Sequence, residues 1–242
     1  MKKIFCIGDI HGEYDLFTSL LKDFHEERHQ LVLIGDLLDR GKFSKQCLLL
    51  GKELVENHHA IYIKGNHEEL FLNFLKEPEE RYHNYLLNGG GETIESLLHE
   101  GAVEEYSATE IAMMIQSRYK ALVFFLKGLP LYYEWQKYVF VHAGVDLTLP
   151  DWYKTSDRDF MWIRKEFHEA KNQIGRTIVF GHTPSNYLHK DLTSTKLWLS
   201  DNKIGLDGGG VYGGSIHGVI FDEVGIVQDI EVFNSHQWEP KF

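Results

Sequence analysis

The sequence predicts a single domain of mixed α/β class, built from 242 residues. Three observations carry this prediction. Short apolar runs alternate with helix-period segments in the first third of the chain, the middle third has helical periodicity, and short apolar runs return in the last third. The hydrophobic fraction of 43% is ample for a buried core, and a single α/β core can reach this length.

The first third predicts a parallel sheet flanked by helices. Ile4–Ile7, Leu31–Ile34 and Ala60–Lys64 are short apolar runs typical of buried strands. Between these runs, apolar residues recur at helical spacing from 16 to 24, and a second helical stretch covers residues 44–55. Because strand, helix, strand, helix, strand is the order of successive βαβ units, the three strands are expected to be parallel.

The middle and last thirds predict a helical stretch and further strands. Residues 69–128 are expected to form an α-helical insertion that packs over the sheet, interrupted by the glycine-rich turn Asn88–Gly91. Strand patterns then return in six runs, and the closely spaced final four are expected to form antiparallel hairpins and a second sheet. The six runs are Tyr138–Val141, Thr177–Phe180, Lys196–Leu199, Lys203–Leu206, His217–Phe221 and Ile226–Val232.

Charge and cysteine content exclude several classes of protein. The formal net charge is −11, with the acidic residues dispersed along the chain, so no nucleic-acid binding is expected. Cys6 and Cys47 offer neither a disulfide framework nor a metal-ligand spacing, and Cys6 is expected to be a buried thiol. No apolar stretch resembles a signal peptide or a membrane span, so no membrane association and a cytoplasmic location are expected.

Polar clusters directly follow five of the predicted strands. They are Gly8–Gly12, Gly35–Gly41, Gly65–Glu68, Val141–Gly144 and Phe180–Pro184. In open α/β sheets, ligands bind beyond the carboxyl ends of the strands, so the five clusters are expected to converge on one crevice. The glycines in the clusters allow the backbone to turn sharply and to approach a ligand closely.

The side chains in these clusters are those that bind a pair of divalent cations. Carboxylates and imidazoles ligate Mn, Fe or Zn, and one carboxylate can bridge two ions. A single Gly-Asp pair, or a single histidine at a strand end, is more often a turn or a structural residue. Because five clusters each carry a potential ligand, a turn or purely structural role for all of them is disfavoured. The candidate ligands are Asp9, His11, Asp36, Asn66, His142 and His182.

The clusters also resemble the motifs of a known family. Gly8–Gly12 reads GDIHG, Gly35–Gly41 reads GDLLDRG and Gly65–Glu68 reads GNHE, and the last two clusters contain VHAG and GHTP. With these motifs the chain resembles the phosphoprotein phosphatase branch of the calcineurin-like metallophosphoesterases. Tyr85–Gly91 and Met161–Arg164 are similar to segments of bacterial and phage lambda-type Ser/Thr protein phosphatases. The resemblance implies two mixed β-sheets packed as a central sandwich and flanked by helices.

The family pattern implies two metal sites in this chain. Asp9, His11 and Asp36 would hold the first ion, and Asp36 would bridge to the second. The remaining ligands of the second ion would be Asn66, His142 and His182. Mn²⁺ is the expected ion at both sites, with Fe or Zn as alternatives, and a hydroxide between the ions would attack phosphorus in line.

The same pattern implies residues that act on the phosphate group. Arg40 and Arg164 match the phosphate-binding arginines, and Asn66 would contribute to substrate binding; a solvated helix arginine is the alternative for Arg164. His67 matches the general acid, with a purely structural role as the alternative. Asp39 would pair with His67, orient its imidazole and favour the protonated form.

The implied function is that of a Ser/Thr protein phosphatase, with phosphotyrosine as a further substrate. Symmetrical diadenosine tetraphosphate hydrolysis uses the same metal core and is the alternative, although those hydrolases tend to have Ala where this chain has Asp39. A non-catalytic phosphate-sensing or scaffold module is a third hypothesis, but it would be expected to have lost a ligand, the histidine or an arginine. The sequence leaves open the oligomeric state, the natural phosphoprotein or small phosphoester, and the roles of Asp207, His217 and Asn88–Gly91.

Overall fold

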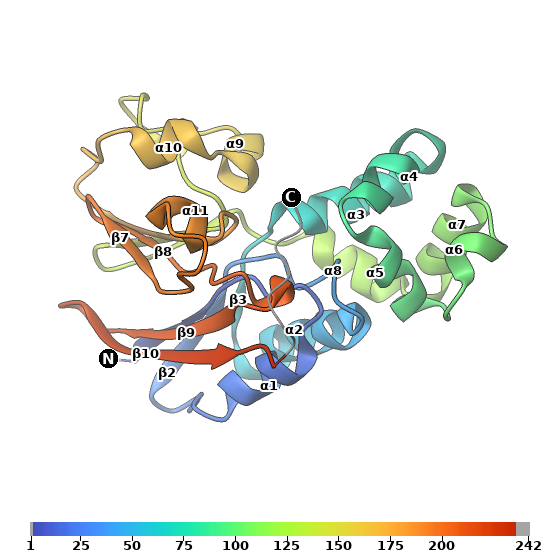
Figure 1. Ribbon diagram of the computed structural model, residues 1–242, viewed down its shortest axis with the longest axis horizontal. Helices are drawn as coiled ribbons and strands as arrows, with labels where there is room; N and C mark the ends of the chain where they lie inside the picture. Colours follow the sequence, from blue (N-terminus) through green and yellow to red (C-terminus); the bar gives the residue numbers. More distant parts are fainter. Residues whose placement is uncertain (1, 236–242) are drawn as a thin grey trace.

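The computed structural model describes residues 2–235, in which two five-stranded sheets face each other (Figure 1). The first sheet has the strand order β10-β9-β1-β2-β3. Its strands β1 (Lys3–Ile7), β2 (His29–Leu33) and β3 (Ile61–Tyr62) are parallel, as predicted. Strand β9 (Ser215–Phe221) pairs with β1 in antiparallel orientation, and β10 (Ile226–Phe233) pairs with β9 in the same way.

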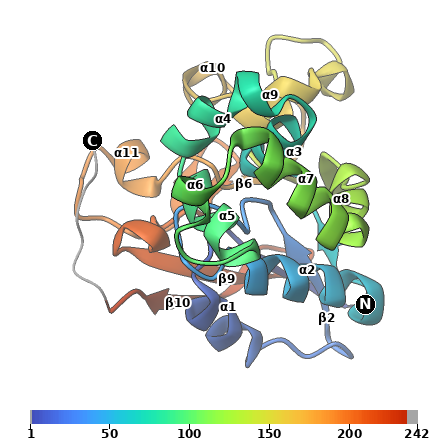
Figure 2. The same cartoon turned by 90° about the vertical axis from the view of Figure 1, so that its right-hand side faces the viewer.

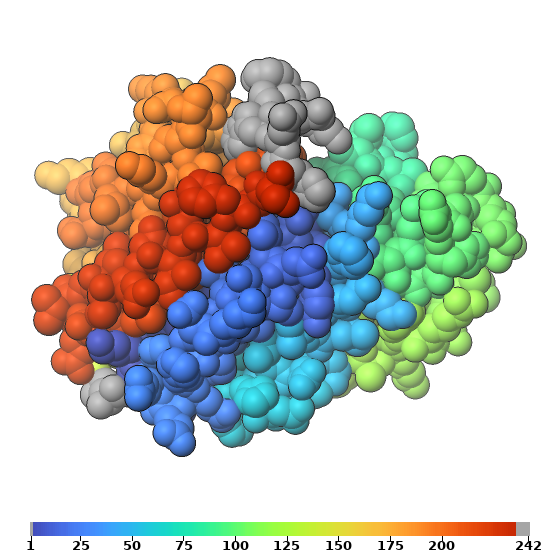
Figure 3. Space-filling view, turned by 60° about the horizontal axis from the view of Figure 1, so that its bottom comes forward, coloured from blue at the N-terminus to red at the C-terminus, as the bar shows by residue number. Residues whose placement is uncertain are grey.

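The second sheet has the order β4-β5-β6-β8-β7. Strands β5 (Tyr138–Val141), β6 (Thr177–Phe180) and β8 (Lys203–Gly205) are parallel, and the edge strands β4 (Tyr132–Trp135) and β7 (Trp198–Ser200) are antiparallel to their neighbours. The final four strands do form two hairpins. The expectation that all four build the second sheet is wrong, because the β9–β10 hairpin joins β1. That hairpin crosses the surface beside the N-terminal part of the chain (Figure 3).

Alternate residues of the central strands face different cores, because successive side chains of a strand point to opposite faces of its sheet. Ile4 and Cys6 of β1 pack in the core between the two sheets, together with Phe140 and Val179. The thiol of Cys6 is buried there, as predicted. Phe5 and the other residues of β1 that face away contribute to the core beneath the helices. The sheets therefore form the predicted sandwich, buried on both faces.

Helices cover the outer faces of the sandwich. Helices α1 (Tyr14–Leu21) and α2 (Ser44–His58) pack on the first sheet, and α9 (Asp157–Trp162) and α10 (Lys165–Glu169) pack on the second. The stretch that was predicted to be helical lies at one end of the molecule and faces the viewer in Figure 2. It comprises α3 (Asn66–Lys76), α4 (Pro78–Leu87), α5 (Gly90–Leu97), α6 (Ala102–Glu105), α7 (Ala108–Arg118) and α8 (Lys120–Lys127).

Short elements complete the fold. The predicted interruption at residues 88–91 is shorter in the structure: Asn88 and Gly89 form the turn between α4 and α5, and Gly90 and Gly91 begin α5. The division of the chain into one domain with an insertion stays a prediction. The remaining elements are η1 (Trp152–Lys154), α11 (Ser185–His189) and η2 (Gly210–Tyr212). None of the helices within residues 2–235 combines the length and the apolar composition needed to cross a bilayer.

A buried histidine ties the β9–β10 hairpin to the segment that precedes β7. His217 Nδ1 lies 2.8 Å from Asp229 Oδ1, and His217 Nε2 lies 2.7 Å from the carbonyl oxygen of Thr195. Both partners accept hydrogen bonds, so the imidazole donates from both nitrogens only when it is charged. Burial opposes that charge, but Asp229, the Thr195 carbonyl and Glu231 outweigh it and raise the pKa of His217. His217 therefore holds structure together and is not placed among the motif residues.

His217→Gln is expected to lower the free energy of unfolding by about 1.5–3 kcal/mol at low pH, the range for hydrogen bonds to a charged group. Because the folded-state pKa of His217 is raised, its contribution is fully present below the unfolded-state pKa, about 6.5. The contribution is lost as the pH rises through the folded-state pKa. Urea unfolding between pH 5.5 and 9 should show the difference between wild type and variant shrinking, with exposed His83→Gln as the control. A difference that does not change with pH would contradict this explanation.

Candidate active site

The five polar clusters meet where the strands of both sheets end. Asp9 and His11 follow β1, Asp36 follows β2, and Asn66 begins α3 after β3. From the second sheet, His142 follows β5 and His182 follows β6. All six side chains are buried, with at most 5% of each residue exposed. The structure thus brings together every residue that the sequence predicted as a metal ligand.

Asp36 lies at the centre of this arrangement. Its Oδ2 atom lies 3.4 Å from His142 Nε2 and 3.5 Å from His11 Nε2. Two groups of potential ligand atoms, each within 4.8 Å of one another, share Asp36: one with His11 and His67, the other with His142 and His182. Such a shared carboxylate fits a binuclear metal site. His67 belongs to the first group in place of Asp9, which differs from the predicted ligand set.

Two buried atoms at the site lack a hydrogen-bond partner within the described part of the chain. They are Asp9 Oδ1 and His182 Nε2. The other carboxylate oxygen of Asp9 accepts a hydrogen bond from the backbone N–H of His182, at 2.8 Å. Buried polar atoms in folded proteins nearly always have a partner, so both atoms fit the positions of cation ligands.

The imidazoles of His11 and His142 are oriented by backbone carbonyls. His11 Nδ1 donates to the carbonyl oxygen of Leu38 at 2.9 Å, and His142 Nδ1 donates to that of Ile34 at 2.8 Å. A carbonyl oxygen can only accept, so the proton of each neutral ring is on Nδ1. Nε2 of each ring then carries the lone pair that a metal ion would bind, and it lies within 3.5 Å of Asp36 Oδ2.

Three buried carboxyl groups concentrate negative charge at the site. Burial and the charges of Asp207 and Asp36 raise the pKa of Asp9, and burial raises the pKa of Asp36 to about 7. Asp207, whose role the sequence left open, is the third member, and burial raises its pKa as well. Divalent cations would offset this repulsion directly, because bound cations invert the local electrostatics of an acidic site.

The backbone at the site adopts conformations that are rare outside glycine. His11, Asp36, Asp39, Arg40 and His182 all have positive φ, between 47° and 71°. Such residues cost about 1–3 kcal/mol each and cluster at functional sites. Neighbouring glycines make room for these turns, as the sequence predicted. A Cβ atom at position 181, for example, would collide with the carboxylate of Asp9.

Glu68 holds two of the motif loops together, a role that the sequence analysis missed. Its carboxylate accepts hydrogen bonds from the backbone N–H groups of Asp36, Leu37 and Gly65, at 3.0, 2.9 and 2.8 Å. The Tyr62 hydroxyl donates to the same carboxylate at 2.7 Å. The signal was present, because Glu68 is the third residue of α3, where a glutamate can cap the helix start.

His67 and Asp39 form the predicted pair. His67 Nδ1 lies 2.7 Å from Asp39 Oδ2, and both residues are buried. The hydroxyl groups of Tyr85 and Thr93 each donate to Asp39 Oδ1 at 2.6 Å, two contacts that the sequence analysis missed. The expected effect of Asp39 on the protonation of His67 stays a prediction. Burial, followed by the charges of Arg40 and other cationic groups, lowers the pKa of His67 in the chain without metal ions.

Each of the two predicted phosphate-binding arginines contacts a residue of the ligand cluster. Arg40 Nη1 lies 2.5 Å from His11 Nε2. Arg164 lies between α9 and α10, where its Nη1 donates to the carbonyl oxygen of His182 at 3.2 Å and to Thr183 Oγ1 at 2.8 Å. Arg164 is exposed, so solvent reaches it at the rim of the site.

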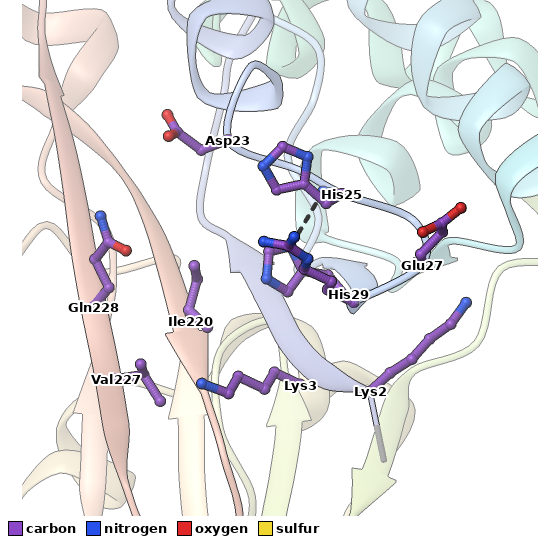
Figure 4. Close-up of a pocket in the computed structure, with 10 residues that line it drawn as sticks. Lys2, Lys3, Asp23, His25, Glu27, His29, Ile220, Val227 and Gln228 are labelled. Atoms are coloured by element: carbon purple, nitrogen blue, oxygen red, sulfur yellow. Dashed lines mark hydrogen bonds between the residues drawn. The ribbon is translucent and has the colours of Figure 1, made fainter.

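A separate cavity of about 700 Å³ lies at the opposite end of the first sheet (Figure 4). There the backbone N–H of His25 donates to His29 Nδ1 at 3.2 Å. Lys3 begins β1 in this cavity, whereas Asp9 follows the other end of that strand, so the cavity is not part of the ligand cluster. The lining residues are Lys2, Lys3, Asp23, His25, Glu27, Arg28, His29, Ile220, Val227 and Gln228.

Known proteins are similar to this chain in sequence. The asymmetrical bis(5'-nucleosyl)-tetraphosphatase PrpE of Geobacillus sp. (strain WCH70) is 28% identical over 250 residues, covering 92% of this chain and 91% of that protein. Serine/threonine-protein phosphatase 1 of Salmonella typhimurium is 27% identical over 192 residues, covering 76% of this chain and 79% of that protein.

The likeness extends to solved structures and to a family model. The cold-active protein-tyrosine phosphatase of a psychrophilic Shewanella species has a similar fold, with a TM-score of 0.54, 15% identity, and coverage of 96% of this chain and 80% of that one. A family model described as calcineurin-like phosphoesterase matches residues 2–213. The chain therefore belongs to the calcineurin-like phosphoesterase family and is a metal-dependent phosphoesterase.

Proposed function

We propose that this chain hydrolyses phosphate monoesters and that its main substrates are phosphoserine and phosphothreonine side chains of proteins, with phosphotyrosine as a further substrate. The observation that carries the proposal is the pair of His67 and Asp39, 2.7 Å apart, beside the buried ligand cluster. A buttressed imidazole at this place supplies the proton that an alkoxide leaving group needs. The similarity to the phosphatase from Salmonella supports the same interpretation.

The proposed metal ligands are those that the sequence motifs imply, and the unpartnered buried atoms Asp9 Oδ1 and His182 Nε2 support two of them. Asp9, His11 and Asp36 would hold one ion. Asp36 would also bind a second ion, together with Asn66, His142 and His182. Divalent ions at these positions would stabilise charge on the phosphoryl oxygens and lower the pKa of water that attacks phosphorus. Manganese is the proposed metal, with iron or zinc as alternatives, because oxygen and imidazole ligands suit all three.

The remaining residues would bind the phosphate and transfer a proton. Arg40 and Arg164 are proposed to bind the phosphoryl oxygens, with Asn66 as a further contact, because guanidinium groups match phosphate in charge and shape. His67 Nε2 would donate to the leaving oxygen, while Asp39 accepts from Nδ1 and keeps the ring oriented. The negative charge of a bound phosphate would favour the protonated imidazole and so offset the effect of burial.

Hydrolysis of dinucleoside tetraphosphates is the second candidate. The similarity to the tetraphosphatase from Geobacillus supports this candidate, because the aligned region covers nearly the whole of both chains. The name of that relative describes asymmetrical cleavage. The sequence motifs had suggested symmetrical cleavage as the alternative. Retention of Asp39 favours the phosphatase, because a phosphomonoester with an alkoxide leaving group needs a proton more than a nucleotide leaving group does. A non-catalytic scaffold is disfavoured, since every ligand, both arginines and His67 are present.

Removal of metal should abolish activity in a reversible way. Dialysis against EDTA is expected to eliminate turnover of p-nitrophenyl phosphate and to lower the melting temperature, since bound ions stabilise the folded state by mass action. Added Mn²⁺ should restore both. Asp36→Asn should retain fewer ions per chain by elemental analysis, whereas the exposed Asp191→Asn should behave as wild type. A full complement of two ions in Asp36→Asn would contradict its place as the shared ligand.

The variant His67→Asn should show whether His67 acts as a general acid or as a metal ligand. As a general acid, His67 should contribute about 10²–10⁴-fold to kcat, and its loss should leave the metal content unchanged. His99→Asn, at an exposed position, is the control for the loss of a histidine. If His67→Asn loses metal after loading with Mn²⁺, His67 is a ligand, as its membership of the first group of ligand atoms would allow.

A substrate panel distinguishes the two candidate functions. With Mn²⁺ supplied, kcat/KM is measured for phosphoserine, phosphothreonine and phosphotyrosine peptides and for diadenosine tetraphosphate. The proposal predicts the highest value for a phosphopeptide. A preference for the dinucleotide of more than about a hundredfold, roughly 2.7 kcal/mol of transition-state discrimination, would overturn it. The products of dinucleotide cleavage, analysed by chromatography, would then show whether cleavage is symmetrical.

A further inference from the structure

Arg40 is held between two segments that lie far from it in the sequence. On one side its backbone N–H donates to the carbonyl oxygen of Gly89, at 3.0 Å, in the turn between α4 and α5. On the other side, the centroid of the Tyr212 ring in η2 lies 5.4 Å from Arg40 Cζ. Neither Gly89 nor Tyr212 belongs to the five strand-end clusters.

The backbone of Arg40 depends on such support. Asp39 and Arg40 have φ values of 69° and 71°, so two successive residues with side chains are in the left-handed region. This conformation is unfavourable for residues with side chains and persists only where the surroundings hold it in place. Gly89 itself has φ of +91°, and a Cβ atom there would lie 2.6 Å from Arg40 Cγ and 2.9 Å from Arg40 N. Only glycine fits against the arginine at this point.

The guanidinium group depends on support of a different kind. A free arginine side chain samples many rotamers, and this freedom has to be lost before the side chain can bind phosphate in one geometry. Tyr212 offers an aromatic face at cation–π distance, and such contacts stabilise a partly buried guanidinium. Tyr212 follows Asp207 in the segment that leads from β8 of the second sheet to β9 of the first.

We propose that Gly89 and Tyr212 are positioning residues that direct the Arg40 guanidinium toward the phosphoryl group. The inference rests on the proposed function, in which Arg40 binds phosphate. The proposal gives the predicted turn Asn88–Gly91 a role: Gly89 holds the backbone of Arg40 in one position through its carbonyl oxygen. The turn also joins the two helices that supply Tyr85 and Thr93 to Asp39, so one helical unit sets the geometry of both neighbouring residues.

The first test separates the tyrosine ring from its hydroxyl. Tyr212→Leu is expected to lower kcat/KM for p-nitrophenyl phosphate by about tenfold or more, since small misplacements of positioning groups are costly. The inhibition constant of inorganic phosphate should rise in parallel, because the same arginine binds it. Tyr212→Phe keeps the ring and should stay within about threefold of wild type on both measures. Metal content and melting temperature should be those of wild type in both variants.

The second test uses a pair of matched glycines. Gly101 has φ of +83°, and a Cβ atom there would meet no atom of the described chain within 4 Å, whereas Gly89 has φ of +91° and contacts Arg40. Alanine at either position strains the backbone, but only Gly89→Ala presses on the arginine. Gly89→Ala should therefore raise the phosphate inhibition constant well above that of Gly101→Ala. Equal constants in two folded variants would overturn the inference for Gly89.

Arg40→Ala distinguishes failure of this inference from failure of the proposed function. Arg40→Ala should lower kcat/KM strongly, and adding Tyr212→Leu to it should cause no further loss, because residues that act as a unit are not additive. If Arg40→Ala retains wild-type kcat/KM, the assignment of Arg40 in the proposed function is wrong. Two other outcomes would show that only the positioning inference is wrong. In the first, Arg40→Ala has a lowered kcat/KM while Tyr212→Leu has the wild-type value. In the second, the double variant loses kcat/KM by the product of the two single losses.

Discussion

The site depends on reciprocal hydrogen bonds between the loop that contains Asp36 and the loop Gly65–Glu68. The Glu68 carboxylate accepts three backbone N–H groups, two from the loop of Asp36 and one from Gly65. In return, Asp36 Oδ1 accepts the backbone N–H of His67, at 3.0 Å. These buried contacts run between loops that follow neighbouring parallel strands, so the strand spacing sets the distance between Asp36 and Asn66. Buried networks of this kind rigidify a structure when every member is satisfied.

The site also joins parts of the fold that belong to different layers. The candidate metal ligands come from loops at the strand ends of both sheets, so the sandwich has to be assembled before the cluster exists. The helical stretch supplies the support for the residues that would act on the substrate: Tyr85 and Thr93 for Asp39, and Gly89 for Arg40. Helices α4 and α5 and the turn between them therefore hold Asp39 and Arg40 in place as well as contributing to the buried core.

Local patterns predicted much of this molecule, and long-range packing accounts for what they missed. The sequence predicts strands β1 and β2, and it predicts that the six candidate ligands lie together, because each depends on a short run of residues and the turn that follows it. Strand β3 was also found, although it is shorter than expected. Strand β4 was missed because its aromatic residues are partly buried without a two-residue alternation. The sheet that receives the β9–β10 hairpin depends on pairing with β1, more than two hundred residues away along the chain.

The imidazole rings of His11 and His142 receive their orientation from peptide carbonyls at Leu38 and Ile34. Every amino acid carries such a carbonyl, so the ring orientation is insulated from side-chain replacement at these two positions. A substitution at Leu38 or Ile34 would change the volume of the side chain but would leave the carbonyl oxygen that accepts the hydrogen bond. The arrangement of the ligands is thus inherited with the path of the main chain, which allows related chains to diverge widely in sequence around an unchanged coordination chemistry.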